Sequence, residues 1–341
     1  MKVNLPLLDQ MLRDNYVRMQ KHPSESLFIY NYTAKAQYDK IWNECTLSCR
    51  GLIMNESKEI IARPFLKFFN LGEDVGQKIP QEAFEVFEKM DGSLGILYWI
   101  DDQPYIATRG SFTSKQALKG NQLLHSKYTD ALAKMNRDCT YLFEIIYPEN
   151  KIVVDYGAEE KLVLLAVVDT QTGEEQALKN IGFPIVHKYD GVNDIHSLST
   201  KNTTNKEGFV VKFKSGYRLK IKFEEYLRIH RIVTNVSSIN IWEYLKEGKE
   251  WDEILDRVPD EFYHWVKNTK LKLEDQYQAI LNQAKLDYRA FESRKETALY
   301  FQTCKYPAVM FNLLDGKPIE KTIWRMIRPS HEKPFNNVDE E

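Results

Sequence analysis

The sequence predicts an α+β domain followed by a helical domain. Up to about residue 223, short runs rich in Val, Ile, Phe, Tyr and Trp are separated by turn residues, which is the pattern of strands. After that point strand signals stop, and apolar residues recur at three- and four-residue steps, which is typical of helices. A length of 341 residues suits two domains. We therefore expect one domain over residues 1–232 and a helical C-terminal domain over residues 233–341.

The composition excludes several classes of protein. Hydrophobic residues make up 43% and charged residues 28%, as in ordinary globular proteins. The formal net charge is −2, so any contact with nucleic acid must come from a local cleft rather than a general basic coat. No apolar run approaches the roughly 18 residues that span a bilayer, and the N-terminus lacks a signal-peptide core. The four cysteines form no CxxC pair, and reduced thiols in a cytoplasmic protein are expected.

The stretch from residue 84 to 99 contains the most informative pattern. Two strand-type runs flank the sequence Met90-Asp91-Gly92-Ser93, and Asp-Gly favours a tight turn. Lys89 is therefore expected where a strand ends at a turn, in a position to face a nucleotide phosphate. Gly92 would let the backbone adopt a positive φ or approach a ligand closely. An ordinary hairpin with a solvated lysine would give the same local pattern.

The other expected elements follow in chain order. We expect a helix over 5–20, strands over 27–33 and 104–108, a helical segment over 114–135 interrupted at Gly120, a strand, turn and second strand over 141–156, a buried strand over 161–169, and a hairpin formed by 207–213 and 217–223. In the C-terminal part, we expect a helix over 271–295 and an apolar segment over 306–328 divided at Asp315-Gly316.

Several charged residues lie within these apolar patterns. Glu144 stands in an apolar run, so its carboxylate must be hydrogen-bonded, paired or bound to a ligand. Lys220 and Lys222 are two residues apart on a strand and therefore share a face, which suits either a polyphosphate or a solvated surface. Lys67 stands among phenylalanines, where it can stack on a base, reach a phosphate, or extend beside a core.

Four short motifs occur in a characteristic order: Lys89-x-Asp91-Gly92, Phe143-Glu144, Glu207-Gly208 and Lys220-x-Lys222. This order resembles the covalent nucleotidyltransferase superfamily of ligases and capping enzymes. The closer resemblance, over roughly residues 28–230, is to the phage-type ATP-dependent RNA ligase family, whose founding member repairs broken tRNA anticodon loops. It is carried by RGLIMN, RPFLKFFNLGE, KMDGSLG, TRGS with SKQAL, YPENKIVVDY and EGFVVKF. The segment after residue 235 does not clearly resemble the founding member's tRNA-specific domain.

The resemblance implies an adenylation domain of antiparallel sheets flanked by helices, and a reaction of three phosphoryl transfers. A lysine attacks the ATP α-phosphate to form lysyl-AMP, AMP passes to an RNA 5′-phosphate, and a 3′-hydroxyl displaces AMP. By resemblance Lys89 is the nucleophile, Lys220 and Lys222 hold the α-phosphate, and Glu207 is a carboxylate on the metal side. The resemblance assigns the nucleotide pocket to Arg50, Lys67, Phe69, Asp91, Gly92, Arg109, Glu144 and Gly208. Glu144 would hold the ribose hydroxyls or, alternatively, the metal.

The same resemblance implies ATP and Mg²⁺ as cofactors, with Mn²⁺ as an alternative. The expected partners are RNA with 5′-phosphate and 3′-hydroxyl ends and an end-healing kinase or phosphatase. A phage-encoded protein acting in a host cytoplasm fits this picture, and no membrane is expected. The alternatives are a DNA ligase, a capping-type nucleotidyltransferase, or a nucleic-acid-binding relative that has lost catalysis. The helical pattern after residue 235 argues against capping enzymes, which usually carry an OB barrel there. The joint presence of Lys89, Glu144, Glu207, Lys220 and Lys222 argues against loss of catalysis.

Overall fold

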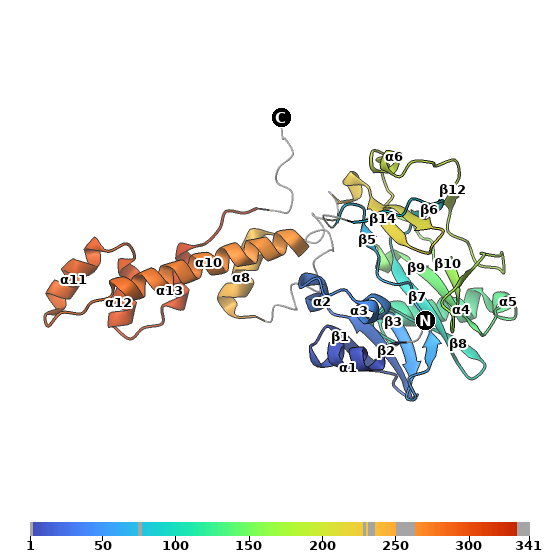
Figure 1. The fold of residues 1–341 in the computed structure, drawn as a ribbon, viewed down its shortest axis with the longest axis horizontal. Coiled ribbons are helices and arrows are strands. Elements are labelled where there is room, and N and C mark those ends of the chain that lie inside the picture. The colour runs from blue at the N-terminus through green and yellow to red at the C-terminus, as the bar shows by residue number, and fades with distance from the viewer. Residues whose placement is uncertain (1–2, 74–76, 228–229, 231–235, 250–262, 333–341) are drawn as a thin grey trace. The chain divides into compact units, whose positions relative to one another are not determined.

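The computed structural model describes residues 3–73, 77–227, 230, 236–249 and 263–332 (Figure 1). The chain divides into two compact units, Met1–Val233 and Thr234–Glu341. The expected boundary at residues 232 and 233 lies outside the described residues. That the two units act as separate functional domains stays a prediction.

The first unit is α+β and contains three sheets, which confirms the predicted fold class. The β2 sheet has the order β1 (Val17–Lys21), β2 (Leu27–Tyr32), β3 (Arg50–Asn55) and β4 (Ile60–Ala62). The β9 sheet has the order β11 (Glu175–Gln176), β10 (Lys161–Asp169), β9 (Cys139–Ile146), β7 (Ser93–Ile100) and β8 (Gln103–Ala107). The β13 sheet has the order β12 (Lys188–Tyr189), β6 (Phe84–Lys89), β13 (Gly208–Phe213), β14 (Arg218–Lys222) and β5 (Phe69–Asn70).

Helices cover the outer faces of two of these sheets. The helices of this unit include α1 (Leu5–Arg13), α2 (Ala34–Tyr38), α3 (Glu44–Ser48), α4 (Lys115–Lys127), α5 (Thr129–Leu132) and α6 (His196–Ser199), with a 3₁₀ turn at Pro148–Asn150. Residues 224–227 are also helical. Residues of α1 and α3 pack on one face of the β2 sheet, and the other face packs on the β9 sheet through Ile29, Ile53 and Ile96. The far face of the β9 sheet packs against α4 and α5. The β13 sheet buries a separate core, which includes Phe209 and Phe213.

The strands expected on both sides of the 90–93 turn are confirmed as β6 and β7, but they do not form a hairpin. Strand β6 pairs with β12 and β13, whereas β7 pairs with β8 and β9. The turn therefore carries the chain from the β13 sheet to the β9 sheet. Gly92 has no positive φ, and its role is close packing, because a Cβ there would lie 2.7 Å from the carbonyl oxygen of Ile145.

Three expected helices differ in the structure. The helix expected over 5–20 ends at Arg13, because Asn15 adopts a left-handed conformation with φ of 59° and the chain then enters β1. Gly120 does not interrupt its helix, but lies within α4 against Ile106 and Ile145. The helix expected over 271–295 corresponds to α10 (Tyr263–Asp287), which includes residues before 271 and ends before 295.

The second strand expected within 141–156 is also absent. After the 3₁₀ turn the chain runs through bends, and the backbone N–H groups of Val153 and Val154 donate to the carboxylate of Asp91. These donors are therefore unavailable to a sheet, which explains why an apolar, β-prone sequence does not form a strand here.

The described residues of the second unit form helices and contain no strand. The helices are α8 (Ser238–Glu247), α10 (Tyr263–Asp287), α11 (Arg294–Thr303), α12 (Pro307–Leu314) and α13 (Glu320–Met326). The expected division of 306–328 at Asp315-Gly316 is confirmed by the break between α12 and α13. The core includes Ile280 and Phe301, and Phe291 lies beyond α10 and is 48% exposed. None of the described helices is both long and apolar enough to cross a bilayer.

A bulge in β3 orients Arg50. Tyr30 pairs with Leu52 and Asn31 with Arg50, so Gly51 is an extra residue in β3. Without that extra residue, strand alternation would place Arg50 on the face opposite to Asn31. Gly51 has a φ of 102°, which favours glycine, and a Cβ there would lie 2.2 Å from Cδ1 of Ile96.

We predict that Gly51→Ala lowers the free energy of unfolding by about 2 kcal/mol or more, because it adds both backbone strain and a clash. Urea denaturation followed by circular dichroism measures the change. Gly191→Ala is the matched control, since Gly191 has a φ of 73° but no atom lies within 4 Å of the place where its Cβ would stand. Equal losses in the two variants would contradict the role of the bulge.

Candidate active site

Two lysines flank a glycine across three strands of the β13 sheet. Gly208 of β13 pairs with Lys89 of β6 on one side and with Lys222 of β14 on the other. Gly208 has a φ of 149°, and a Cβ there would lie 1.9 Å from the carbonyl oxygen of Ile221, so a side chain does not fit between the lysines. Lys220 lies two residues before Lys222 on the same face of β14 and is 8% exposed. The expected shared face of these two lysines is therefore confirmed.

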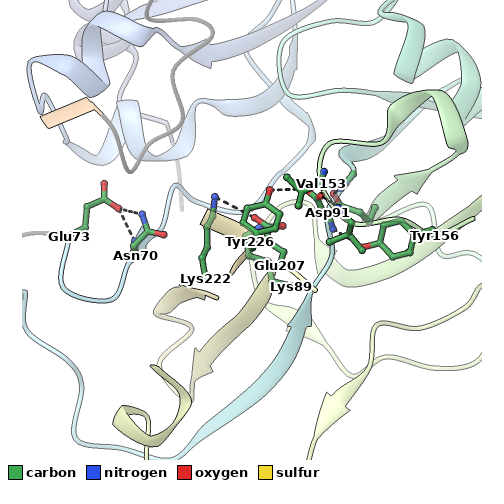
Figure 2. Close-up of polar contacts among 12 residues, drawn as sticks. Asn70, Glu73, Lys89, Asp91, Val153, Tyr156, Glu207, Lys222 and Tyr226 are labelled. Carbon is green, nitrogen blue, oxygen red and sulfur yellow. Dashed lines mark hydrogen bonds and ion pairs between the residues drawn. The ribbon is translucent and has the colours of Figure 1, made fainter. Parts of the chain in front are cut away.

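Glu207 lies between the two flanking lysines. One carboxylate oxygen is 2.7 Å from Nζ of Lys89 and the other is 3.4 Å from Nζ of Lys222 (Figure 2). The side chain of Glu207 is 4% exposed, and that of Lys222 is 10% exposed. Charges this buried need paired partners, and Glu207 supplies one to each lysine.

Glu144 brings a second carboxylate from the β9 sheet. It is 9% exposed, and one of its oxygens accepts a hydrogen bond from the backbone N–H of Gly92 at 2.9 Å. This confirms the expectation that a carboxylate in an apolar run would be hydrogen-bonded. Burial raises the pKa of Glu144 to about 8; Lys89 opposes this increase, while Glu207 adds to it.

Asp91 holds the surrounding loops together. Its carboxylate accepts hydrogen bonds from the N–H groups of Val153 at 2.9 Å and Val154 at 2.8 Å, and from the hydroxyl of Tyr226 at 2.8 Å (Figure 2). Its own N–H donates to the hydroxyl of Tyr156 at 2.9 Å. Sequence reasoning missed both tyrosines. Tyr226 is 135 residues from Asp91, and nothing local marks it as a partner.

These groups open into one cavity of about 660 Å³, here called the Lys89 cavity. Residues from both five-stranded sheets line it, together with phenylalanines from the 63–70 segment. The sequence-predicted residues in its lining are Arg50, Lys89, Asp91, Gly92, Glu144, Glu207 and Lys222. Arg50 lies 5.6 Å from the centre of the Phe68 ring. A concave site with convergent charges and aromatic walls suits an anionic ligand with a planar base.

An ion-pair cluster that sequence reasoning missed also lines this cavity. Glu175 of β11 pairs with Lys212 at 2.8 Å and with Arg218, whose guanidinium lies 4.6 Å from the centre of the Phe65 ring. Burial alone would raise the pKa of Glu175, but Arg218 and Lys212 outweigh it and lower that pKa. The cluster joins the β9 sheet to the β13 sheet.

Three other predicted residues gather outside the lining of the Lys89 cavity. Nζ of Lys67 lies 5.4 Å from the ring centres of Tyr32 and Trp42 and 5.3 Å from that of Phe69, and Lys67 is 5% exposed. Arg109 donates a hydrogen bond to the hydroxyl of Tyr32 at 3.2 Å. Lys67 and Arg109 thus both lie against Tyr32, and Lys67 also lies against Phe69.

The carboxylates of the cavity fit a metal that takes most of its ligands from a nucleotide. Among the described residues, no group of three or more His, Cys, Asp and Glu side chains is placed to hold a metal ion. Glu144 and Glu207 both line the Lys89 cavity. Mg²⁺ is commonly held by one or two carboxylates together with phosphate oxygens and water.

Comparison with known proteins decides the family. Residues 48–227, more than half of the chain, match the model of a family described as RNA ligase. The chain belongs to this RNA ligase family. The match includes the β6–β7 turn, Glu144, Glu207 and both lysines of β14, and it confirms the resemblance drawn from the motifs.

Three relatives illustrate the match. A protein of Autographa californica nuclear polyhedrosis virus, named as a candidate bifunctional polynucleotide kinase/RNA ligase, is 29% identical over 71% of this chain and 39% of its own length. A Thermovibrio ammonificans protein, named as a candidate RNA ligase, is 29% identical over 73% of this chain and 71% of its own. The RNA ligase of Rhodothermus phage RM378 is 24% identical over 75% of this chain and 74% of its own length. This chain thus matches well under half of the baculovirus protein.

Solved structures are less similar. A Naegleria gruberi RNA ligase mutant with ATP and Mn has 20% identity and a TM-score of 0.36, covering 43% of this chain and 52% of that one. A candidate ATP-dependent DNA ligase of Aquifex aeolicus has 14% identity and a TM-score of 0.47, and the match covers 92% of this chain and 100% of that one. At TM-scores of this size, the family assignment depends on the sequence match.

We predict that the metal-free protein loses stability as the pH rises from about 5 to about 8. The folded protein retains the Glu144 proton over this range, because the pKa of that group is about 8, whereas the unfolded chain has released it. The contribution of Glu144 to the free energy of unfolding is therefore greatest below the pKa that Glu144 has in the unfolded chain. It decreases until the pH exceeds about 8, the pKa of Glu144 in the folded protein. Glu144→Gln should remove this pH dependence, so its free energy of unfolding should exceed that of wild type by several kcal/mol between pH 6 and 9. Urea denaturation in the presence of EDTA measures the difference. The exposed Glu149→Gln is the control, and parallel pH profiles for Glu144→Gln and wild type would contradict the prediction.

Proposed function

We propose that the protein is an ATP-dependent RNA ligase that joins 5′-phosphate and 3′-hydroxyl RNA ends through lysyl-AMP and adenylylated RNA. The observation that carries the proposal is the placement of Lys89 at the end of β6, inside a cavity that also holds Glu207, Lys222 and Glu144. The nucleophile, the phosphate-binding cation and two carboxylates thus face one space. Family membership supports ligation of RNA.

In the first step, Nζ of Lys89 attacks the α-phosphorus of ATP, forms a P–N bond and releases pyrophosphate. The lysine must lose a proton before attack, and Glu207 at 2.7 Å is within reach of that proton. Lys222 and Lys220 would stabilise the charge that grows on the phosphate oxygens. The RNA 5′-phosphate then displaces Lys89 from AMP, and the RNA 3′-hydroxyl finally displaces AMP.

The remaining predicted residues are assigned to nucleotide binding. Glu144 and Glu207 would hold a divalent cation, Mg²⁺ or Mn²⁺, which supplies charge neutralisation to the phosphates. Glu144 can alternatively accept from the ribose hydroxyls. Arg50, Lys67 and Arg109 would bind phosphate oxygens, which suits their basic charge. Phe69, Asp91, Gly92 and Gly208 would shape the pocket.

Other parts of the proposal concern partners and alternatives. The baculovirus relative combines polynucleotide kinase with RNA ligase in its name, which supports a kinase or phosphatase that prepares the RNA ends for this chain. Repair of tRNA and a cytoplasmic location stay predictions. A DNA ligase, a capping-type enzyme and a silent nucleic-acid-binding relative remain the alternatives. Comparing adduct formation with labelled ATP and with labelled GTP distinguishes a capping-type enzyme or a silent relative from an RNA ligase. Comparing the sealing of RNA ends and DNA ends distinguishes a DNA ligase.

We predict that Lys89→Ala forms no covalent AMP adduct and lowers ATP-dependent RNA sealing by about 10³-fold or more, because the nucleophile is lost. Incubation with labelled ATP and Mg²⁺, followed by peptide mapping, measures the adduct. Lys134→Ala, at an exposed lysine near the end of α5, is the control and should form the adduct normally.

Pre-adenylylated RNA separates a lost nucleophile from a damaged pocket. Lys89→Ala should still seal this substrate, since the last step needs the pocket but no covalent lysine. A normal AMP adduct in Lys89→Ala would refute the assignment of the nucleophile. Equal, complete loss on both substrates would refute the proposed division between the steps.

We also propose that the helical second unit selects RNA and takes no part in chemistry. All the predicted catalytic residues belong to the first unit, and basic residues of the second unit include Lys267, Lys270, Lys272 and Arg289. Lys270 pairs with Glu274 at 3.5 Å, whereas Lys272 and Arg289 are exposed. The exposed pair is therefore better placed for phosphate contact.

We predict that a chain ending at Val233 still adenylylates Lys89 but binds structured RNA and simple single strands equally. The reason is that the first unit alone contains the Lys89 cavity. Adduct formation and sealing of the two RNA types measure the two properties. Sealing rates at increasing salt should depend less steeply on salt than those of the full chain. A truncated chain that folds but forms no adduct would show that the second unit belongs to the catalytic unit.

A further inference from the structure

Three rows of paired residues cross β6, β13 and β14 on one face of the β13 sheet. The rows, in order from the end of β6, are Lys89, Gly208 and Lys222; then Phe87, Val210 and Lys220; then Glu85, Lys212 and Arg218. The residues that alternate with these along the strands, including Val86 and Val211, belong to the core on the other face. Members of all three rows line the Lys89 cavity, so the cavity extends along the strands from Lys89 to the third row.

The second row gives the middle of the Lys89 cavity an apolar surface. Phe87 and Val210 both line the cavity, and so do Leu165 of β10 and Val186. Phe87, Leu165 and Val186 belong to one apolar cluster, so side chains from both sheets meet here. A planar, weakly hydrated group such as a nucleobase gains most from burial against such a surface.

The third row ends the cavity with charged groups instead. One carboxylate oxygen of Glu175 lies 2.8 Å from Nζ of Lys212, and the other pairs with the guanidinium of Arg218. All three residues line the Lys89 cavity, and we call them the Glu175 cluster. The side chains of Glu175 and Arg218 are only 17% and 12% exposed. Sheltered ion pairs add little net stability compared with apolar side chains of similar shape, so joining the two sheets does not by itself require charges here.

Glu175 can accept a hydrogen bond from a ligand and keep both of its cations. An ionised carboxylate has about four acceptor positions, and Lys212 and Arg218 approach different oxygens. Burial would raise the pKa of Glu175, but Arg218 and Lys212 lower it overall, so the carboxylate is ionised at neutral pH. The guanidinium of Arg218 lies 4.6 Å from the centre of the Phe65 ring, which restrains it. The cluster therefore presents a charged acceptor in a fixed position on the cavity surface.

The register places this acceptor at the far end of a bound nucleotide. Lys89 and Glu85 are four residues apart on β6, which corresponds to roughly 14 Å along the strand. A nucleotide with its phosphate at Lys89 and its base on Phe87 and Val210 points the edge of that base at the third row. Adenine has an amino group at position 6, which donates, whereas guanine has an oxygen there, which accepts. A carboxylate attracts the amino group and repels the oxygen.

We propose that Glu175 reads the base of the nucleotide that reacts at Lys89. Its carboxylate accepts a hydrogen bond from the 6-amino group of adenine and disfavours guanine, whose oxygen would set two acceptors against each other. Lys212 and Arg218 are positioning residues that hold the carboxylate. This inference rests on the proposed function, and it names a residue that selects ATP over GTP.

Equilibrium binding of nucleoside monophosphates, measured by calorimetry without pyrophosphate or RNA, tests the proposal without catalysis. The probes are AMP, GMP and purine riboside 5′-monophosphate, which carries hydrogen in place of the adenine amino group. Wild type should bind AMP about tenfold more tightly than purine riboside 5′-monophosphate, as expected for one hydrogen bond to a charged group. It should bind AMP about 100-fold more tightly than GMP, because the guanine oxygen adds repulsion.

Glu175→Ala should bind AMP and purine riboside 5′-monophosphate equally, since the acceptor is lost and the two changes are non-additive. Glu160→Ala is the matched control and should keep the tenfold preference. Glu160 also forms an ion pair, with Lys119 at 2.7 Å, but is not among the described residues that line the Lys89 cavity. If Glu175→Ala does not fold, Glu175→Gln tests the same point. It retains the shape and a neutral acceptor, so the preference should fall to about threefold.

Two results would overturn the proposal. The first is wild type binding AMP and purine riboside 5′-monophosphate equally. The second is a tenfold preference that persists in Glu175→Ala or Glu175→Gln while both affinities decrease alike, as expected if the cluster only joins the two sheets. Lysyl-AMP formation by wild type tests the proposed function separately. A protein that prefers AMP but forms no adduct would refute the ligase chemistry and keep the base contact, whereas an adduct without the preference would refute only the base contact.

Discussion

The carboxylate of Glu207 between Lys89 and Lys222 is the interaction on which the Lys89 cavity depends. Lys89 and Lys222 lie on the two strands that flank β13, and two ammonium groups this close repel each other, most strongly when they are shielded from water. Glu207 pairs with both, and Gly208 leaves the space in which the three groups meet. Breaking a buried pair by removing one partner typically costs about 3–5 kcal/mol, so Glu207 supports the geometry as well as any chemistry.

The position of Lys89 relative to Glu144 depends on how two separate sheets are joined. The turn after Lys89 crosses from the β13 sheet to the β9 sheet, and the N–H of Gly92 in that turn donates to Glu144. Glu175 provides another link between the sheets through its pairing with Lys212 and Arg218. The cavity walls are therefore connected by polar contacts as well as by the chain itself.

Local patterns predicted what depends on local physics. The strands around the 90–93 turn, the shared face of Lys220 and Lys222, and a hydrogen-bonded Glu144 all follow from alternation and burial. The turn chemistry could not show that β6 and β7 pair with different neighbours, because an Asp-Gly turn constrains only its own residues. Tyr226 depends on a contact with Asp91 that is distant in sequence, and it has no local signature. The catalytic roles themselves stay predictions.

The ion pair between Lys89 and Glu207 that supports the cavity would also restrain Lys89 in its proposed role as nucleophile. Nζ of Lys89 lies 2.7 Å from Glu207, and the proposed attack on phosphorus would require this ion pair to be broken first. A triphosphate in the cavity would give Lys222 a second anionic partner. The attraction that holds Glu207 between Lys89 and Lys222 would then be weaker. The pKa of Glu144, raised by burial to about 8, keeps a second negative charge away from Glu207 at neutral pH. The side chains of the cavity thus balance one another's charges, and an anionic ligand would have to redistribute them before Lys89 could react.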